Sequence, residues 1–313
     1  LYSTLNAKYD LSPVLKGLGL FGTVSFDAYE TFESTQTAQM DSWNYDYDNL
    51  AVTDVSQFKY TKYTTKAALS NPSANQRGYY YNLNLFGGVS YKNSFGKHNV
   101  DARAFVRYYR NEEAGSDYSA QQSASSNRYL AYNFQGTYDY ANKYIASVNL
   151  SRMGCDNFSP DDRWGTFWGA SAGWVLSEES WMKKLGFVNL LKLRASYGEA
   201  GQSSTGAGRY PYQSIYGSAT GYGFGYNGTF VNGYAESKTG NANSKWEISK
   251  MVNLGIDWNL WNSKLYGSFD VFKEWRSNIL VSRSTVPETI LGVPVAQDSY
   301  GKVESRGYEL VLG

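Results

Sequence analysis

The stretch YYYNLNLFGGVSY at residues 79–91 alternates between two kinds of side chain. The odd positions are apolar, with tyrosine at both ends: Tyr79, Tyr81, Leu83, Leu85, Gly87, Val89 and Tyr91. The even positions are mostly small and polar, among them Asn82, Asn84 and Ser90. A period of two puts alternate side chains on opposite faces of a β-strand. The stretch therefore predicts a strand whose two faces contact different surroundings. These can be a protein core, water or lipid, and alternation alone does not decide among them.

The same alternation recurs along the whole chain and predicts an all-β fold. The expected strands lie at about 2–10, 18–29, 79–91, 98–110, 128–138, 144–153, 165–177, 190–198, 249–260, 265–275 and 301–312. Composition agrees, because aromatic residues make up 17% of the 313 residues, with 29 Tyr and 9 Trp. Aromatic and β-branched residues favour strands, whereas the common helix formers are not dominant here.

The connections between these strands alternate in length. Short ones are expected at 11–17, 92–97, 139–143 and 261–264, and two long ones, at about 30–78 and 199–248, approach fifty residues. Short turns at one end and long loops at the other are typical of an up-and-down barrel in an outer membrane. The chain contains no run of about 18 apolar residues, so the sequence predicts no transmembrane helix.

Strand length also favours a membrane barrel. Tyr81 and Tyr91 are ten residues apart, which is ~33 Å of extended chain. A tilt of about 40° reduces this to ~25 Å along the membrane normal, the height of the apolar band between the two aromatic girdles of such a barrel. The apolar faces are nearly free of charge, and the polar faces carry Asn, Ser, Gly, Asp and Arg.

Two other classes of protein compete with the barrel. A soluble or surface-attached β-protein that binds glycans would also alternate apolar and polar residues. A hydrolase on a β scaffold would need a catalytic constellation, and the pair Asp161 and Asp162 is its best candidate. Adjacent residues on an extended chain point apart, so this pair does not form a shared-proton dyad by itself. We expect no enzyme activity.

The residue types that carry metals and nucleophilic chemistry are scarce. The chain has one histidine, His98, and one cysteine, Cys155, so neither a zinc cluster nor a His-based triad is expected. Asn44, Asp46 and Asp48 place oxygen ligands at alternate positions, but the glycine and glutamate of a calcium loop are missing. We predict no metal and no cofactor. The net charge of +1 gives no reason to expect nucleic acid as a partner.

The long connections are rich in aromatic rings beside Asn, Gln and Asp. Such rings stack on sugars or hold peptides, although large loops also need aromatic residues to pack against each other. We predict that some of this set contact a ligand or a partner protein: Trp43, Tyr45, Tyr47, Tyr210, Tyr212, Tyr216, Tyr222, Phe224 and Tyr226.

Several segments resemble the SusC/RagA group of TonB-linked outer-membrane transporters. LLKLRASYGEAGQ (190–202) is similar to the recurrent "LKLRASYGxxGN", with Gln202 where asparagine is usual. The segment 245–280 resembles the "WExSxxxNxGxDxxxxxxRLxGSxDxYxxxTxDLL" hairpin, with Lys264 where arginine is usual. GKVESRGYELVL (301–312) is like "GxVxNKGxEL", and 162–185 fits the "FWxxSxGWxxSxExF" run.

The resemblance implies a fold, a function and partners. It implies that residues 1–313 form the middle-to-late part of a β-barrel, about 11 strands of a larger barrel of about 22, and that signal peptide, plug and final strands lie outside this chain. The odd strand number and the end of the chain in mid-strand at Gly313 fit that expectation, because a barrel with an open edge leaves backbone groups unpaired in lipid. The implied function is TonB-dependent import of oligosaccharide or peptide across the outer membrane. The implied partners are outer-membrane lipid, a SusD-like lipoprotein at the long-loop side, and the TonB complex acting through residues outside this chain.

Overall fold

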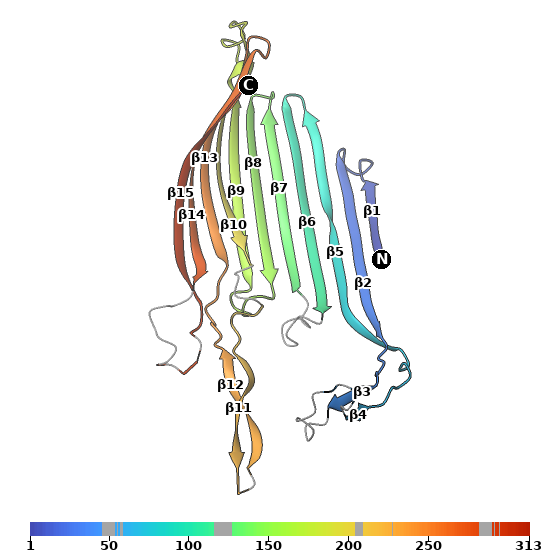
Figure 1. Cartoon of the computed structure of the whole chain (residues 1–313). Coiled ribbons are helices and arrows are strands. Elements are labelled where there is room, and N and C mark those ends of the chain that lie inside the picture. The colour runs from blue at the N-terminus through green and yellow to red at the C-terminus, as the bar shows by residue number, and fades with distance from the viewer. Residues whose placement is uncertain are drawn as a thin grey trace.

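The computed structural model describes residues 1–45, 54, 56, 59–115, 127–203, 209–226, 228–281, 290, 292–293 and 295–313. Its elements, labelled in Figure 1, are β1 (Tyr2–Asp10), β2 (Leu18–Thr35), β3 (Ser42–Tyr45), β4 (Tyr60–Thr64), β5 (Ser73–Phe95), β6 (His98–Gly115), β7 (Asn127–Tyr140), β8 (Tyr144–Cys155), β9 (Trp164–Val175), the 3-10 turn η3 (Leu176–Glu178), β10 (Val188–Gln202), β11 (Ile215–Phe224), β12 (Thr229–Lys238), β13 (Glu247–Leu260), β14 (Leu265–Val281) and β15 (Asp298–Leu312). Among these residues, none of the helical segments is both long and apolar enough to cross a membrane.

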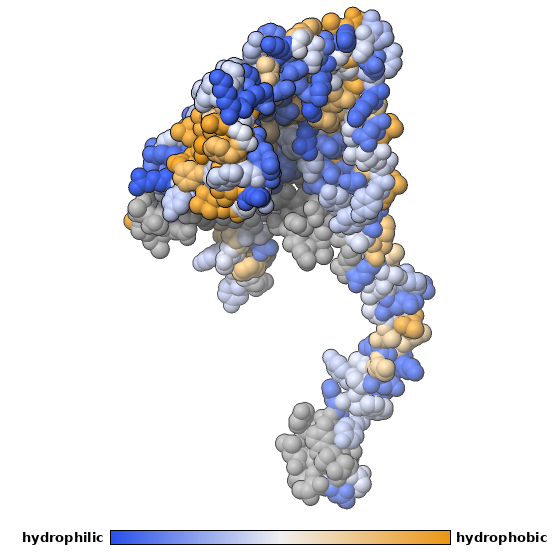
Figure 2. Space-filling model, turned by 90° about the horizontal axis from the view of Figure 1, so that it is seen from above, coloured by the Kyte–Doolittle hydropathy of each residue, from blue (hydrophilic) through white to orange (hydrophobic). Residues whose placement is uncertain are grey.

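Eleven long strands form one antiparallel sheet in chain order, β1-β2-β5-β6-β7-β8-β9-β10-β13-β14-β15. Each inner strand pairs with both of its neighbours in this order, and β1 and β15, with one partner each, form the two edges. This confirms the predicted all-β meander and each of the eleven predicted strands. The sheet is a single curved layer (Figures 1 and 2).

Short turns join the strands at the end drawn uppermost in Figure 1. The first ends at Gly17, whose φ of +86° places it in the left-handed region that favours glycine. A Cβ on Gly17 would also lie 2.0 Å from the carbonyl oxygen of Lys92 on the neighbouring strand. The turn between β13 and β14 is built from Trp261, Asn262 and Ser263, all with positive φ.

The opposite end of the sheet differs from the sequence-based expectation. The segments 30–78 and 199–248, expected to be loops, begin and end with strand residues, since β2 runs to Thr35 and β5 starts at Ser73. Each connection also contains a separate two-stranded hairpin, β3–β4 and β11–β12. Figure 1 shows the two hairpins projecting beyond the sheet at different places along its lower edge.

The two faces of the sheet have opposite character. Looking down the strands in Figure 2, hydrophilic side chains line the inner side of the curve and hydrophobic ones lie along its outer side. Buried side chains are few, because one layer of sheet encloses no core. A small buried cluster, Cys155, Phe158, Phe167 and Trp246, closes the long-loop ends of β8, β9 and β13. Cys155 is only 3% exposed, so its thiol lies buried in packing.

Candidate functional site: the inner wall and its rim

Strand register forms an apolar row on the outer face from β2 to β9. Side chains that pair across six strands form one row: Leu20, Val89, Ala104, Phe134, Leu150 and Trp168. Leu150 is 47% exposed and Phe134 is 40% exposed, and no other part of the described chain covers them. An exposed apolar surface of this extent needs an apolar partner.

The adjacent row of register faces the inner side and is polar. It contains Ser90, Arg103, Gln135, Asn149, Gly169, Gly198, Met251 and Glu274. Gly169 and Gly198 stand opposite each other in this row. The even-numbered residues of 79–91 belong to this face, as the alternation predicts. One step of register thus separates an apolar face from a hydrophilic one.

Aromatic rings mark both ends of the outer apolar band. Near the short turns, the Tyr144 ring stacks with Tyr140 at 6.5 Å and with Trp174 at 6.3 Å between centroids. Near the long loops, Tyr132 and Trp164 stack at 6.1 Å. Trp164 and Trp174 are ten residues apart on β9, which gives the same ~25 Å height along a tilted strand as Tyr81 and Tyr91. The distance between the two groups of aromatic rings therefore matches the distance between the aromatic girdles of a membrane barrel.

An ion-pair network connects three strands on the inner face. The Arg194 guanidinium donates two hydrogen bonds of 2.8 Å to the Asp257 carboxylate and one of 2.9 Å to Asp270. Gly255 leaves the room for it, since a Cβ there would lie 2.5 Å from the Asp270 Oδ1. These three charged side chains are partly buried, and each has a hydrogen-bonded partner of opposite charge that offsets the cost of its burial. The network links β10, β13 and β14.

Tyrosines stack on the inner face towards the long loops. Tyr29 and Tyr80 lie 5.3 Å apart, and Tyr109 and Tyr129 lie 4.8 Å apart, both pairs nearly parallel. The Arg107 guanidinium lies 5.5 Å from the centroid of the Tyr129 ring. The sequence does not predict these two tyrosine pairs, because each pair forms only through the register between two strands.

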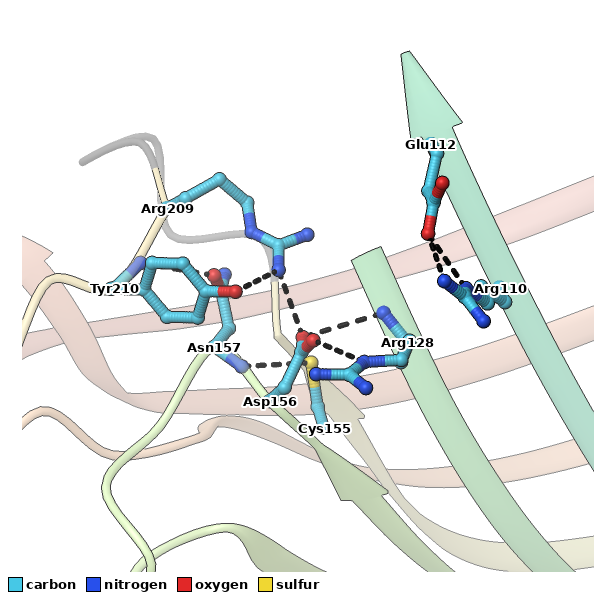
Figure 3. Close-up of polar contacts among 8 residues, drawn as sticks. All are labelled: Arg110, Glu112, Arg128, Cys155, Asp156, Asn157, Arg209 and Tyr210. Atoms are coloured by element: carbon cyan, nitrogen blue, oxygen red, sulfur yellow. Dashed lines mark hydrogen bonds and ion pairs between the residues drawn. The ribbon is translucent and has the colours of Figure 1, made fainter. Parts of the chain in front are cut away.

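Asp156 is the centre of a network at the rim (Figure 3). Its carboxylate accepts hydrogen bonds from the Nε of Arg128 at 3.3 Å and from the Nη2 of Arg209 at 3.0 Å. Next to it, the Asn157 Oδ1 accepts from the backbone N–H of Tyr210. Since Arg128 is the second residue of β7 and Arg209 precedes the β11–β12 hairpin, this network attaches the hairpin's base to the sheet.

The predicted loop aromatics do not form one site. Trp43 and Tyr45 lie on β3, whereas Tyr216, Tyr222 and Phe224 lie on β11. Tyr226 follows in the turn of that second hairpin and is fully exposed, while Tyr222 is 72% exposed and in edge contact with Phe224 at 5.4 Å. Tyr47 lies outside the described residues. A role for these rings in binding stays a prediction.

Tyr210 and Tyr212 have a different setting from the hairpin rings. They contact each other edge to face at 6.1 Å, and the Arg209 guanidinium lies 4.8 Å from the centroid of the Tyr210 ring. The same Arg209 donates a hydrogen bond of 3.1 Å to the Tyr210 hydroxyl. Both rings are half-buried at the base of the hairpin. Their contacts brace the hairpin, so they are less available to a partner than Tyr222.

The residues considered for metal and acid–base chemistry lie apart in the described part of the chain. It holds no group of three or more potential metal ligands among His, Cys, Asp and Glu. The Nδ1 of His98 lies 2.7 Å from the Tyr138 hydroxyl at the short-turn end, far along the sheet from the rim. Asp161 and Asp162 lie in the turn between β8 and β9, where the Asp162 N–H bonds the carbonyl of Ser159.

The chain is similar to a known protein family and to several named relatives. The family model "TonB dependent receptor-like, beta-barrel" matches residues 1–313. The chain is 37% identical over 175 residues to TonB-dependent receptor P39 of Formosa agariphila, covering 56% of this chain and 16% of that protein. It is 27% identical over 252 residues to TonB-dependent receptor SusC of Bacteroides thetaiotaomicron, covering 75% and 25%. A solved structure of the RagAB peptide transporter superimposes with a TM-score of 0.70 at 16% identity, over 99% of this chain and 34% of that one. The chain thus spans between about a sixth and a quarter of the length of these curated relatives.

Proposed function

The chain belongs to the TonB-dependent receptor-like β-barrel family, and from this membership we propose that it forms part of the wall of an outer-membrane nutrient importer. The family places it in the outer membrane among receptors and transporters, so it is not an enzyme, and the soluble alternative is wrong. The resemblance to the SusC/RagA group is confirmed. The observation that carries the proposal is the single step of register between an apolar row and a polar row.

The substrate we propose is an oligosaccharide, imported with energy from TonB. The apolar row faces lipid, and the polar row faces the interior of a larger barrel that holds a plug supplied by other residues of the complete protein. The central part of this wall carries the uncharged amide side chains of Asn133, Gln135 and Asn149, which can hydrogen-bond to sugar hydroxyls. Peptide is the competing substrate class, as the RagAB name states for that protein.

Import can be tested in cells that carry the complete transporter. Deleting its gene should abolish uptake of one labelled oligosaccharide, and deleting TonB should have the same effect. Uptake that persists without TonB would contradict energised import. Uptake of labelled peptides alone would assign the other substrate class.

We further propose that a SusD-like surface lipoprotein contacts the β11–β12 hairpin. Its exposed aromatic side chains include Tyr222, Phe224 and Tyr226, and exposed aromatic rings of this kind are common in interface cores. Replacing these three with alanine in the complete transporter should reduce copurification of the lipoprotein. Ser218→Ala with Thr220→Ala, both exposed on the same hairpin, is the matched control. Unchanged association in the triple variant would refute the proposal.

A further inference from the structure

Charged side chains occur on the outer face of the sheet, towards the long-loop end of its last strands. The apolar outer residues Leu254, Val271 and Tyr308 pair across β13, β14 and β15. Counting by twos along each strand from this row, and along β10 from its partner Ala195, stays on the same face. It reaches Glu199, Lys250, Lys273, Lys302, Glu304 and Arg306, which we call the outer charged cluster. Charges on a lipid-facing surface are costly unless they reach polar groups, so this cluster needs a polar partner.

The outer charged cluster lies at the long-loop boundary of the apolar band. Lys250 is ten residues from Leu260 at the short-turn end of β13, the same separation as between the two aromatic ends of β9. Lys273 and Arg306 pair one outer position closer to the short turns than Lys250. Lys302 lies two outer positions beyond Arg306 towards the long loops. Lysine and arginine near such a boundary keep their stems in the apolar layer and extend their charged ends to the headgroups.

Aromatic rings accompany these charges, as they do at the other interfaces of the wall. The Lys273 Nζ lies 5.0 Å from the centroid of the Trp275 ring. The Tyr197 hydroxyl donates a hydrogen bond of 2.5 Å to the Glu199 carboxylate. Tyrosine and tryptophan prefer the level of the headgroups, where an apolar ring and a polar group are both accommodated. The cluster is therefore at headgroup depth in the leaflet on the long-loop side.

Two of the four cations already have carboxylate partners. The Lys250 Nζ lies 3.0 Å from the Glu199 carboxylate, and the Lys273 Nζ lies 2.8 Å from that of Glu304. These two pairs leave no carboxylate of the cluster without a cation. A further cation in the cluster can be neutralised only by an anion from elsewhere.

Lys302 and Arg306 are the two cations that remain. Within the part of the chain that the structure describes, neither forms a hydrogen bond or an ion pair. Arg306 also stands directly opposite Lys273 in the register of β14 and β15, and like charges in that position repel each other. An anion placed beside Arg306 and Lys273 would offset this repulsion.

The chemistry of the cluster favours a lipid phosphate over a second copy of the chain. A two-fold contact through this surface would bring the unpaired cations of the two copies together. A phosphate group accepts two parallel hydrogen bonds from the fork of an arginine, and it pairs with lysine as a point charge. The apolar outer positions Val271 and Tyr308 continue from the cluster into the apolar band and are exposed, so acyl chains attached to the phosphate would lie along them.

We propose that the outer charged cluster binds the phosphate headgroup of an acylated lipid in the extracellular leaflet. Arg306 and Lys302 contact the phosphate, with Lys273 beside them, and the acyl chains cover Val271 and Tyr308. The long loops of such barrels are extracellular, which assigns the leaflet. This binding goes beyond the import function proposed above and depends only on the place of the chain in the outer membrane.

Native mass spectrometry of the complete transporter in a non-ionic detergent tests this assignment. The probes are diphosphoryl lipid A, monophosphoryl lipid A and monogalactosyl diacylglycerol, which has acyl chains but no phosphate. Both phosphorylated lipids should remain bound and the galactolipid should not. Excess inorganic phosphate should leave the lipid in place because it has no acyl chains. This comparison uses the unmodified protein and so needs no folded variant.

A double variant then locates the site. Lys302→Gln with Arg306→Gln should raise the Kd for the phosphorylated lipids by about tenfold or more, because it removes two charge-assisted contacts. The matched control is Lys183→Gln with Lys184→Gln, two exposed lysines at the short-turn end of the sheet. The control should keep the Kd within about twofold of the unmodified protein. Heat-dependent mobility on gels checks that both variants are folded.

Four results would overturn the proposal. These are no binding of either phosphorylated lipid, equal binding of the galactolipid, displacement of the lipid by inorganic phosphate, and a double variant that matches the control. Loss of a dimer of transporters, with lipid binding unchanged, would instead assign the cluster to an interface between copies and would reject the lipid. Uptake is measured separately: loss of import with lipid binding intact would reject the import function and leave the lipid site standing.

Discussion

The outer and inner faces of the sheet are built from the same strands, yet their side chains differ in polarity. Leu150 and Asn149 are neighbours in the chain, and each continues a row that crosses the wall through its register partners. The outer row is apolar and uncovered, whereas the inner row is polar and contains glycines. Composition averaged over the strand hides this difference. The comparison teaches that the surroundings of a residue in this chain follow from its parity and from the register of its neighbours.

The largest effect should come from a charge placed on the wrong face. Leu150→Arg near the middle of β8 puts a cation into lipid and should cost ~2–4 kcal/mol. Asn149→Arg, one residue away, should leave stability nearly unchanged because its side chain meets water or polar groups. The complete transporter carrying each substitution can be refolded into lipid vesicles, and urea titration then measures the free energy of unfolding of both variants. Equal losses in the two variants would contradict the assignment of faces.

A smaller effect should separate two inner-face glycines. A Cβ on Gly88 would lie 2.1 Å from the Ala104 carbonyl oxygen and 2.7 Å from the Phe105 Cβ, whereas one on Gly198 meets nothing within 4 Å. Gly88→Ala should therefore destabilise the barrel by about 1–3 kcal/mol through overpacking. Gly198→Ala should have little effect, and urea titration of both variants in vesicles measures the difference. The reverse order would mean that the register around Gly88 is wrong.

The smallest effect concerns pH at the short-turn end. Hydrogen bonds from the Tyr144 hydroxyl, the Trp174 Nε1 and the Lys143 Nζ lower the pKa of the Glu179 carboxyl below its usual range. A lowered folded-state pKa gives stability that is present above the ordinary pKa and is lost as pH falls through the folded one.

Glu179→Gln should thus lower the Tm at pH 7, and the difference from the unmodified protein should vanish at strongly acidic pH. Glu178→Gln, which removes an exposed pair with Lys183, is the control and should shift the Tm little. A Glu179→Gln deficit that is independent of pH would point to packing instead.

The sequence predicts the sheet far better than the loops or the site. All eleven sheet strands could be found, because a lipid face and a polar face enforce strict alternation. The alternation weakens in the ETFEST end of β2 and in β11, where neither face is continuously apolar, so the sequence predicts loops for these two segments.

The polar cluster of Asn133, Gln135 and Asn149 on the inner face was beyond sequence reasoning for a different reason. Asn133 and Gln135 already lie on the polar face of their predicted strand. Their meeting with Asn149 and with the glycines of β9 and β10 depends on register, which the alternating pattern does not specify between strands joined by long loops.

Spin labels along β8 test the central claim most directly. In a background with Cys155 replaced by serine, five variants of the complete transporter each carry one cysteine, at position 147, 148, 149, 150 or 151. Each variant is spin-labelled and reconstituted in lipid vesicles. The account predicts that collisions with oxygen dominate at 148 and 150, and that collisions with a water-soluble nickel chelate dominate at 147, 149 and 151. The same accessibility at all five positions, or the opposite alternation, would contradict a wall with lipid on one side and an aqueous interior on the other.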